Sequence, residues 1–261
     1  MPLSTEYTSK TPNAEGQFNY TAEEASVWRD LFELQMSRLR RHASKAYLDG
    51  QVALGMTGSE VPQVKDVDAK LFGLTGAGVK AVDALIPQDE FSTLLSNRKF
   101  PVATFIRKRE HFDYIEEPDI FHECFGHCPM LTNDAFCQFL EGFGRLSLEL
   151  GDAYSERLFR LFWFTIEFGL IREGDALKAF GAGIISSPEE LENVISGSPK
   201  VVPFDLETVL RTPYRIDIVQ PVYFAIDSFE QLADCIKVDM RQAIDQAARQ
   251  GDLPAAFEAA A

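Results

Sequence analysis

Apolar residues recur with a helical period along much of the chain. The first such stretch begins at Thr21, where Glu24 completes a capping box, and continues to about Tyr47. A later stretch begins at Asn133 or Asp134 and carries a stripe of phenylalanines and leucines. With four further segments of similar pattern, the predicted helices cover residues 21–47, 62–74, 88–97, 133–146, 155–172 and 228–248.

Predicted strands are fewer and shorter. Residues 79–86 and 100–107 are apolar and partly β-branched, which predicts two strands, and residues 201–203 and 215–217 are expected to be extended. Residues 180–187 form a glycine-rich stretch that predicts a loop. The expected fold class is therefore α+β, predominantly helical, with small β elements.

The two ends of the chain differ in composition from its middle. Residues 1–20 are rich in Ser, Thr, Pro, Asn and Gly and lack periodicity, which predicts a flexible N-terminal arm. Residues 251–261 are mostly small and predict a flexible C-terminal tail. No repeat or low-complexity linker interrupts residues 21–250, so these are expected to form a single domain.

Composition and charge argue against several classes of function. Hydrophobic residues make up 46% of the 261 positions, as in ordinary globular proteins, and 21 phenylalanines suggest an aromatic-lined interior. The net charge of −15 argues against binding to nucleic acid. No apolar run approaches the length of a membrane span, and the polar N-terminus does not resemble a signal peptide. We therefore expect a cytoplasmic protein with reduced cysteines.

Two of the 4 histidines, His122 and His127, fall within residues 118–129. Positions five apart lie about 140° apart on an ideal α-helix, so the two imidazoles would not share a face. We expect a helix that ends near Gly126, with non-helical backbone turning His127 back toward His122. Such convergence favours a metal site. The alternatives are a chance pairing, or a histidine that is capped or ion-paired by its neighbour Glu123.

Glu167 is a lone acid in the otherwise apolar run 161–170. A buried carboxylate is normally neutralised, paired or bound to a metal, because leaving it unpaired costs several kcal/mol. The alternatives are an ion pair with an arginine or a helix face that reaches water. Together with His122 and His127, it would complete the ligand set of a non-haem iron(II) oxygenase, which is two imidazoles and one carboxylate with other positions open.

Three cysteines, Cys124, Cys128 and Cys137, lie near the histidines and raise the alternative of a zinc site. They lack the paired C-x-x-C spacing of structural zinc sites. Small buried apolar residues are the favoured interpretation.

Taken together, several motifs resemble those of the pterin-dependent aromatic amino acid hydroxylases. The resemblance extends over about residues 72–229, and its motifs are residues 118–123, 126–129, 163–170 and 181–187. It implies iron(II) bound by His122, His127 and Glu167. It also implies that a tetrahydropterin and O₂ act with the iron to hydroxylate the ring of an aromatic amino acid.

The same resemblance implies roles for further residues. Phe91 would stack on the pterin, and Val82, Leu85 and Ile86 would lie in the loop that surrounds the cofactor. Glu123, beside the first histidine, would reach the pterin through water. Arg107 would bind the substrate carboxylate through two parallel hydrogen bonds, and Asp119 would orient the guanidinium group. Trp163 would pack against the substrate ring, and Gly183 and Ser186 would lie in the loop that closes over the substrate.

Within this resemblance, conversion of phenylalanine to tyrosine is the expected reaction, and tryptophan is the alternative substrate. The apolar Ile216 disfavours tyrosine as a substrate. Two other functions are weighed: a zinc hydrolase built on His-Glu-x-x-x-His, whose spacing is one residue longer than that of zinc proteases, and a non-catalytic metal-storing protein. The regulatory domain and the long C-terminal oligomerisation helix of the animal enzymes have no counterpart in the sequence, so an unregulated monomer that binds only small molecules is expected.

Overall fold

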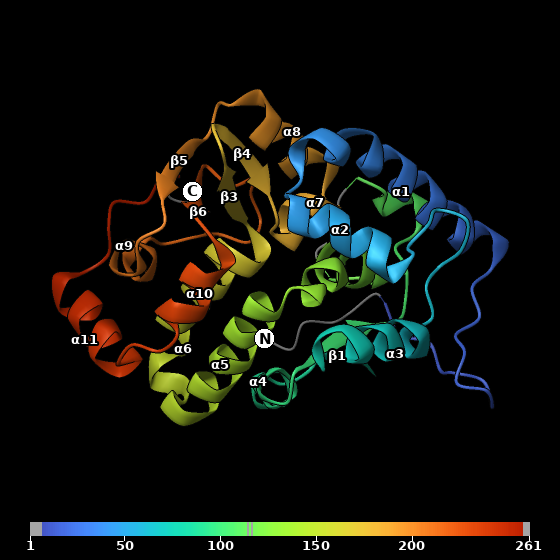
Figure 1. Cartoon of the computed structure of the whole chain (residues 1–261), viewed down its shortest axis with the longest axis horizontal. Coiled ribbons are helices and arrows are strands. Elements are labelled where there is room, and N and C mark those ends of the chain that lie inside the picture. The colour runs from blue at the N-terminus through green and yellow to red at the C-terminus, as the bar shows by residue number, and fades with distance from the viewer. Residues whose placement is uncertain (1–6, 114, 116, 258–261) are drawn as a thin grey trace.

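The computed structural model describes residues 7–113, 115 and 117–257 and shows a predominantly helical α+β fold, which confirms the predicted class (Figure 1). A four-stranded sheet with α9, α10 and α11 beside it occupies one side of the molecule, and α1, α2 and α3 occupy the other. The helices are α1 (Ala22–His42), α2 (Lys45–Leu54), α3 (Val64–Thr75), α4 (Gln88–Ser96), α5 (Asp134–Leu150), α6 (Asp152–Phe162), α7 (Ala182–Ser186), α8 (Pro188–Ser196), α9 (Leu206–Arg211), α10 (Phe229–Cys235) and α11 (Met240–Gln250).

Shorter helical turns and strands complete the architecture. The non-α turns are the 3₁₀ segments η1 (Arg109–His111) and η3 (Cys128–Thr132) and the π-helices η2 (Phe121–His127) and η4 (Trp163–Glu167). The strands are β1 (Gly78–Val82), β2 (Lys99–Ala103), β3 (Gly169–Glu173), β4 (Ala176–Ala179), β5 (Lys200–Pro203) and β6 (Val222–Ile226).

The first predicted helix is two helices in the structure. Its start is as expected, because the side chain of Thr21 accepts from the Glu24 amide and the Glu24 carboxylate accepts from the Thr21 amide. The helix breaks at Ser44, whose amide donates to the Ala179 carbonyl at 2.8 Å and whose hydroxyl caps α2 by accepting from Tyr47. Contact with the end of β4 therefore overrides a helical pattern that continues through the break.

Strands β1 and β2 pair in parallel and are joined through α4. Both are shorter than the predicted ranges 79–86 and 100–107. The chain leaves β2 before Arg107, whose amide donates to the Asp119 carboxylate at 2.9 Å rather than to a neighbouring strand. Residues with a role in the site thus replace the end of the second strand.

The central predicted helix, 155–172, ends five residues early. Helix α6 continues directly into the π-helix η4, which ends at Glu167, and the chain then turns into strand β3. Gly174, at φ 61°, lies in the turn between β3 and β4 and does not end a helix. Glu167 therefore lies at the junction of a helix and a strand.

The four strands of the second sheet are ordered β4-β3-β6-β5, antiparallel between β3 and β4 and parallel elsewhere. Strand β6 was not predicted. All five of its residues are buried, and an apolar run without alternation cannot be told from a buried helix by period alone.

The segment 215–217 forms bends rather than a strand. The predicted helix 228–248 is divided into α10 and α11, and Asp239 caps the second of these helices.

One connected hydrophobic core extends from Phe18 to Ala247 and includes residues of α1, α5, both π-helices and β6. Residues 7–20 carry no helix or strand, but they lie against the rest of the fold. Tyr7 stacks on Phe105 with ring centroids 4.7 Å apart, and Phe18 is buried.

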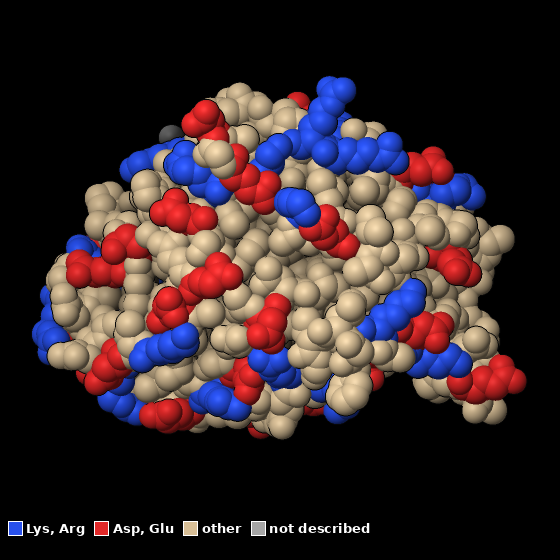
Figure 2. Space-filling view, viewed as in Figure 1, with Lys and Arg blue, Asp and Glu red and all other residues tan. Residues whose placement is uncertain are grey.

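Acidic and basic side chains are interspersed over most of the face shown in Figure 2, and basic side chains gather along its upper edge. Among the described residues, no helix has the length and apolar character needed to cross a membrane.

Candidate active site

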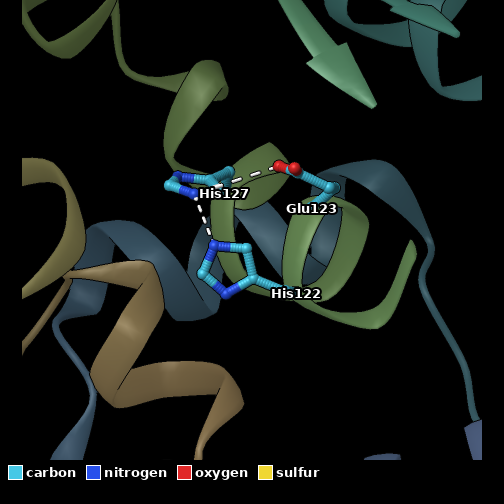
Figure 3. A group of neighbouring side chains, drawn as sticks. All are labelled: His122, Glu123 and His127. Carbon is cyan, nitrogen blue, oxygen red and sulfur yellow. Dashed lines mark hydrogen bonds and ion pairs between the residues drawn. The ribbon is translucent and has the colours of Figure 1, made fainter. Parts of the chain in front are cut away.

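The histidine motif forms a π-helix, η2, and this geometry brings the two histidines together. The Cys128 amide donates to the Glu123 carbonyl, the i→i+5 pattern of a π-turn. A wider turn moves residue i+5 back toward the side of residue i. Figure 3 shows the rings of His122 and His127 converging from this one segment. The helix ends at His127, next to the expected position, but the prediction of non-helical backbone there was wrong, because η2 is helical with a longer repeat and η3 follows it directly.

Three side-chain donors converge. His122 Nε2 and His127 Nε2 are 3.0 Å apart, and Glu167 places one oxygen 3.2 Å from His127 Nε2 and the other 3.4 Å from His122 Nε2. Two ligands at right angles and about 2.1 Å from one ion would be about 3 Å apart. The spacing of the donors and their identity therefore fit a divalent metal ion.

Burial and local contacts favour the ligand forms of these groups. Burial lowers the pKa of His122 to about 4, so its imidazole is neutral near pH 7. Its Nδ1 lies 2.8 Å from the hydroxyl of Ser186. Burial opposes ionisation of Glu167, but the facing His127 and His122 outweigh it and lower the pKa of Glu167 below its ordinary value. A neutral His122 and an ionised Glu167 are the forms in which these two groups bind a metal ion.

Glu123 is a second acid near the imidazoles, and its properties differ from those of Glu167. Its nearest oxygen is 4.0 Å from His127 Nε2 (Figure 3). Burial raises the pKa of Glu123 well above its ordinary value, and the nearby Glu167 raises it further. A carboxyl group whose ionisation burial opposes, at the greater distance, is a weaker candidate ligand than Glu167.

The expected glycine loop contains a short helix, α7, that packs against both π-helices. The Gly181 carbonyl accepts from the amides of Ile184 and Ile185, which closes this turn. A Cβ at Gly181 would lie 2.4 Å from the Glu167 carbonyl oxygen, and one at Gly183 would lie 2.6 Å from the Phe168 ring. Glycine at these positions allows the close approach that places Ser186 beside His122.

Arg107 and Asp119 form a buried bidentate ion pair. The Nε and Nη2 atoms of Arg107 donate to the two oxygens of Asp119, each at 2.9 Å, and the two side chains are 3% and 0% exposed. Asp119 also accepts from the His122 amide at 3.0 Å. Because Arg107 offsets the effect of burial, the pKa of Asp119 is below its ordinary value. One carboxylate thus connects the expected substrate arginine to the backbone of a metal-ligand candidate.

Trp163 lies at the start of η4 within a set of aromatic and polar contacts. Its ring stacks on Tyr214 with centroids 4.6 Å apart and lies 4.5 Å from the Phe168 ring. Its Nε1 donates to the side chain of Gln220 at 3.0 Å. The sequence analysis missed Tyr214 and Gln220. Neither lies in a recognised motif, and only Tyr214 offers a weak signal, as an aromatic residue two positions before Ile216.

The residues expected to bind the pterin lie on separate elements. Val82 ends β1, and Leu85 and Ile86 lie in the connection to α4, where Leu85 is 41% exposed. Phe91 lies on α4 and contacts Phe162 edge to face, with centroids 5.6 Å apart. Ile216, weighed as a pocket residue, is 70% exposed.

The cysteines near the histidines belong to the core. Cys124, Cys128 and Cys137 are all buried and pack in the main hydrophobic cluster, as small apolar residues do. Burial raises the pKa of the Cys128 thiol well above its ordinary value, and the neighbouring Cys124 adds to the effect. A neutral thiol is a poor metal ligand, which supports the interpretation favoured from the sequence.

Comparison with known proteins gives the class of this fold and site. Residues 3–249 match the family model described as biopterin-dependent aromatic amino acid hydroxylase. The chain is 42% identical over 255 residues to the phenylalanine-4-hydroxylase of Vibrio cholerae, covering 97% of this chain and 88% of that protein. The chain belongs to the biopterin-dependent aromatic amino acid hydroxylases.

Solved structures agree with this assignment. The phenylalanine hydroxylase of Legionella pneumophila superimposes with a TM-score of 0.93 at 43% identity, covering 96% of this chain and 100% of that one. The phenylalanine hydroxylase of Chromobacterium violaceum, with bound iron(III) and oxidised 7,8-dihydrobiopterin, gives a TM-score of 0.86 at 36% identity, covering 95% and 93%.

Proposed function

We propose that this chain is a phenylalanine 4-monooxygenase, which converts L-phenylalanine to L-tyrosine with O₂ and a tetrahydropterin. The observation that carries the proposal is the convergence of His122, His127 and Glu167, with donor atoms 3.0–3.4 Å apart, in a member of this family. Curated bacterial relatives named phenylalanine-4-hydroxylase, at 40–43% identity, support phenylalanine as the substrate.

His122, His127 and Glu167 would hold iron(II), which with the reduced pterin supplies the electrons that activate O₂. If Nδ1 of His122 donates to Ser186, its Nε2 is left with a free lone pair. Burial opposes ionisation of Glu167, but its contacts with His127 and His122 hold its pKa below the ordinary value. Phe91 would stack on the pterin, with Val82, Leu85 and Ile86 around it, and the neutral Glu123 would reach the pterin through water.

Arg107 would bind the substrate carboxylate. Among the described residues, Asp119 takes two of its five N–H groups and the Phe112 carbonyl, at 3.4 Å, takes a third. The remaining donors are available for a carboxylate, while Asp119 keeps the guanidinium plane fixed. Trp163 would form the wall for the substrate ring.

A product assay tests this function. Metal-stripped protein is reloaded with iron(II) and given a tetrahydropterin, O₂, and phenylalanine or tryptophan in parallel. We expect tyrosine from phenylalanine only when iron and pterin are both present, and a loss of at least about a thousandfold in kcat/KM for Glu167→Ala, since removal of one catalytic group has effects of that order. Glu189→Ala, an exposed acid on α8, is the control and should leave turnover unchanged. Hydroxylation of tryptophan alone, or zinc retained with no product, would contradict the proposal.

We further propose that the protein is a cytoplasmic monomer. Among the described residues, the exposed large apolar side chains lie on several elements, including Val52 on α2, Leu148 on α5 and Val238 after α10. Light scattering should give the mass of a single chain, 29.3 kDa. A mass of two chains at micromolar concentration would show that the proposal of a monomer is wrong.

A further inference from the structure

A partly buried hydrogen-bond network lies beside the indole of Trp163, and the buried Gln220 is its centre. The Gln220 Oε1 accepts from Trp163 Nε1 at 3.0 Å. Its Nε2 donates to the carbonyls of Arg215 at 3.0 Å and Ile218 at 2.8 Å. Gln220 is 2% exposed. A single amide therefore joins the indole to the segment 215–218.

The main chain of Gln220 is held in turn by α8. The Glu190 Oε1 accepts from the Gln220 amide at 2.9 Å, and its Oε2 accepts from the Tyr223 hydroxyl. Asn193 donates both to the Gln220 carbonyl, at 3.0 Å, and to the Tyr223 hydroxyl, at 2.9 Å. Each main-chain and side-chain polar group of Gln220 thus has a partner.

The indole is also held by packing. Tyr214 stacks on it with an interplanar angle of 21°, and Tyr214 directly precedes the segment that Gln220 holds. A fully satisfied buried network fixes one geometry, since any displacement leaves a polar group unpaired. The network therefore sets the position of Trp163 and of the segment after Tyr214 together.

We propose that Gln220 is a positioning residue for the aromatic ring of the substrate, and that Glu190 anchors it. The inference rests on the proposed function, in which Trp163 forms the wall against which that ring packs. Loss of the network would free both the indole and the segment 214–218. The pocket would then discriminate less well between phenylalanine and the larger tryptophan.

The first test reads Trp163 directly in metal-free protein. The chain has 2 tryptophans, so the ¹H–¹⁵N spectrum contains two indole signals. Trp28 donates its Nε1 to the Thr57 carbonyl at 2.9 Å and serves as the internal reference. In Gln220→Leu, we expect the Trp163 signal to move upfield and exchange faster with water, while the Trp28 signal stays in place. An unchanged Trp163 signal would overturn the proposal.

The second test reads substrate selection. In Gln220→Leu, we expect KM for phenylalanine to rise about tenfold, the equivalent of one buried hydrogen bond, with a smaller change in kcat. The ratio of kcat/KM for phenylalanine to that for tryptophan should fall. Glu190→Leu should reproduce both effects. Glu190→Gln keeps an acceptor for the Gln220 amide and should restore near wild-type values; an equal defect in Glu190→Gln would contradict the anchoring role.

A matched variant separates positioning from general loss of stability. Gln63 bridges the main chain of Phe18 through both ends of its amide, at 2.7 and 3.1 Å, far along the chain from Trp163. Gln63→Leu should lower the melting temperature without moving the Trp163 signal or KM. Equal effects from Gln63→Leu and Gln220→Leu would overturn the proposal. If the wild-type protein makes no tyrosine, the proposed function fails, and the indole signals alone decide whether Gln220 positions Trp163.

Discussion

Ser186 contacts one nitrogen of His122 and would leave the other available to a metal. Its hydroxyl lies 2.8 Å from Nδ1, and both groups are held in the contact between α7 and η2. A hydrogen bond there leaves Nε2 directed toward His127 and Glu167. Partners of this kind orient a ligating imidazole and raise its basicity.

We therefore expect Ser186→Ala to weaken iron(II) binding by about 10- to 100-fold. Anaerobic titration with iron(II) measures this change. Ser187→Ala is the control, because Ser187 caps α8 by accepting from the Glu190 amide at 3.2 Å. Its loss should cost about 1 kcal/mol of stability and leave metal affinity unchanged. Equal affinities for wild type and Ser186→Ala would mean that the hydroxyl does not orient the ligand.

Glu190 gives the protein a specific dependence of stability on pH. Burial raises the pKa of Glu190 to about 7, whereas its ordinary value is 4.5. Between these values the native protein holds a proton that the unfolded chain releases, so the contribution to stability is complete below about pH 4.5 and is lost as the pH rises to about 7. The loss is about 2–3 kcal/mol.

Glu190→Gln should remove this part of the pH dependence, so that the variant gains stability relative to wild type as the pH rises from 4.5 to 7. Urea unfolding at a series of pH values measures the difference. Glu189→Gln, at the exposed neighbouring position, removes a charge that adds to the raised pKa of Glu190, so it should reduce this pH dependence without abolishing it. Parallel profiles for wild type and Glu190→Gln would show that Glu190 is ionised in the native protein.

At the scale of elements, the site depends on two π-helices and the short helix packed between them. Helix η2 supplies both imidazoles, η4 supplies Glu167, and α7 supplies Ser186. Gly181 lets α7 approach η4, since a Cβ there would lie 2.4 Å from main-chain atoms of Glu167 and Gly169. Main-chain atoms at a helix-to-strand junction cannot move aside without moving the carboxylate.

Gly181→Ala should therefore destabilise the protein by at least about 2 kcal/mol and weaken iron binding with it. Gly73→Ala is the matched control, because Gly73 is an exposed helical glycine of α3 with nothing within 4 Å of the added Cβ. That change should stabilise by about 0.5–1 kcal/mol. Thermal unfolding gives the direction of each change in stability. An unchanged stability of Gly181→Ala would show that α7 can withdraw from η4.

Helix starts could be predicted from the sequence, and the π-helices could not. Thr21 and Asn133 cap helices as expected, because capping is a local hydrogen bond between near neighbours. A π-turn differs from an α-turn by one residue in its hydrogen-bond pattern, and its energy depends on distant contacts. In η2 one such contact is the Phe125 carbonyl, which accepts from the Tyr47 hydroxyl of α2 at 2.9 Å.

At the scale of the whole molecule, the sequence indicated the chemical groups of the candidate site better than the residues that hold those groups in place. The sequence singled out His122, His127 and Glu167 because their residue types are unusual in their surroundings, and the structure brings the three side chains together. The ion pair of Arg107 with Asp119 followed from the family resemblance, and the structure shows it as a bidentate contact. Gln220 and Tyr214 were missed because their contacts to Trp163 span about fifty residues of sequence, and no local pattern encodes them.

The whole fold also explains why the site lies at its centre. The core that runs from Phe18 to Ala247 includes apolar residues of η2 and η4, so the donors are held by the same packing that stabilises the chain. Changes to that packing should affect metal binding and stability together, whereas a change to a ligand should affect metal binding alone. This distinction lets a ligand be identified by experiment.

The most direct test of the central claim is therefore anaerobic iron(II) titration of three proteins: wild type, Glu167→Gln and Glu123→Gln. We expect one iron per chain in wild type and in Glu123→Gln, and binding weakened more than about 100-fold in Glu167→Gln, the loss expected for a ligand. Unchanged binding by Glu167→Gln, with loss in Glu123→Gln, would contradict the assignment of His122, His127 and Glu167 as the metal ligands.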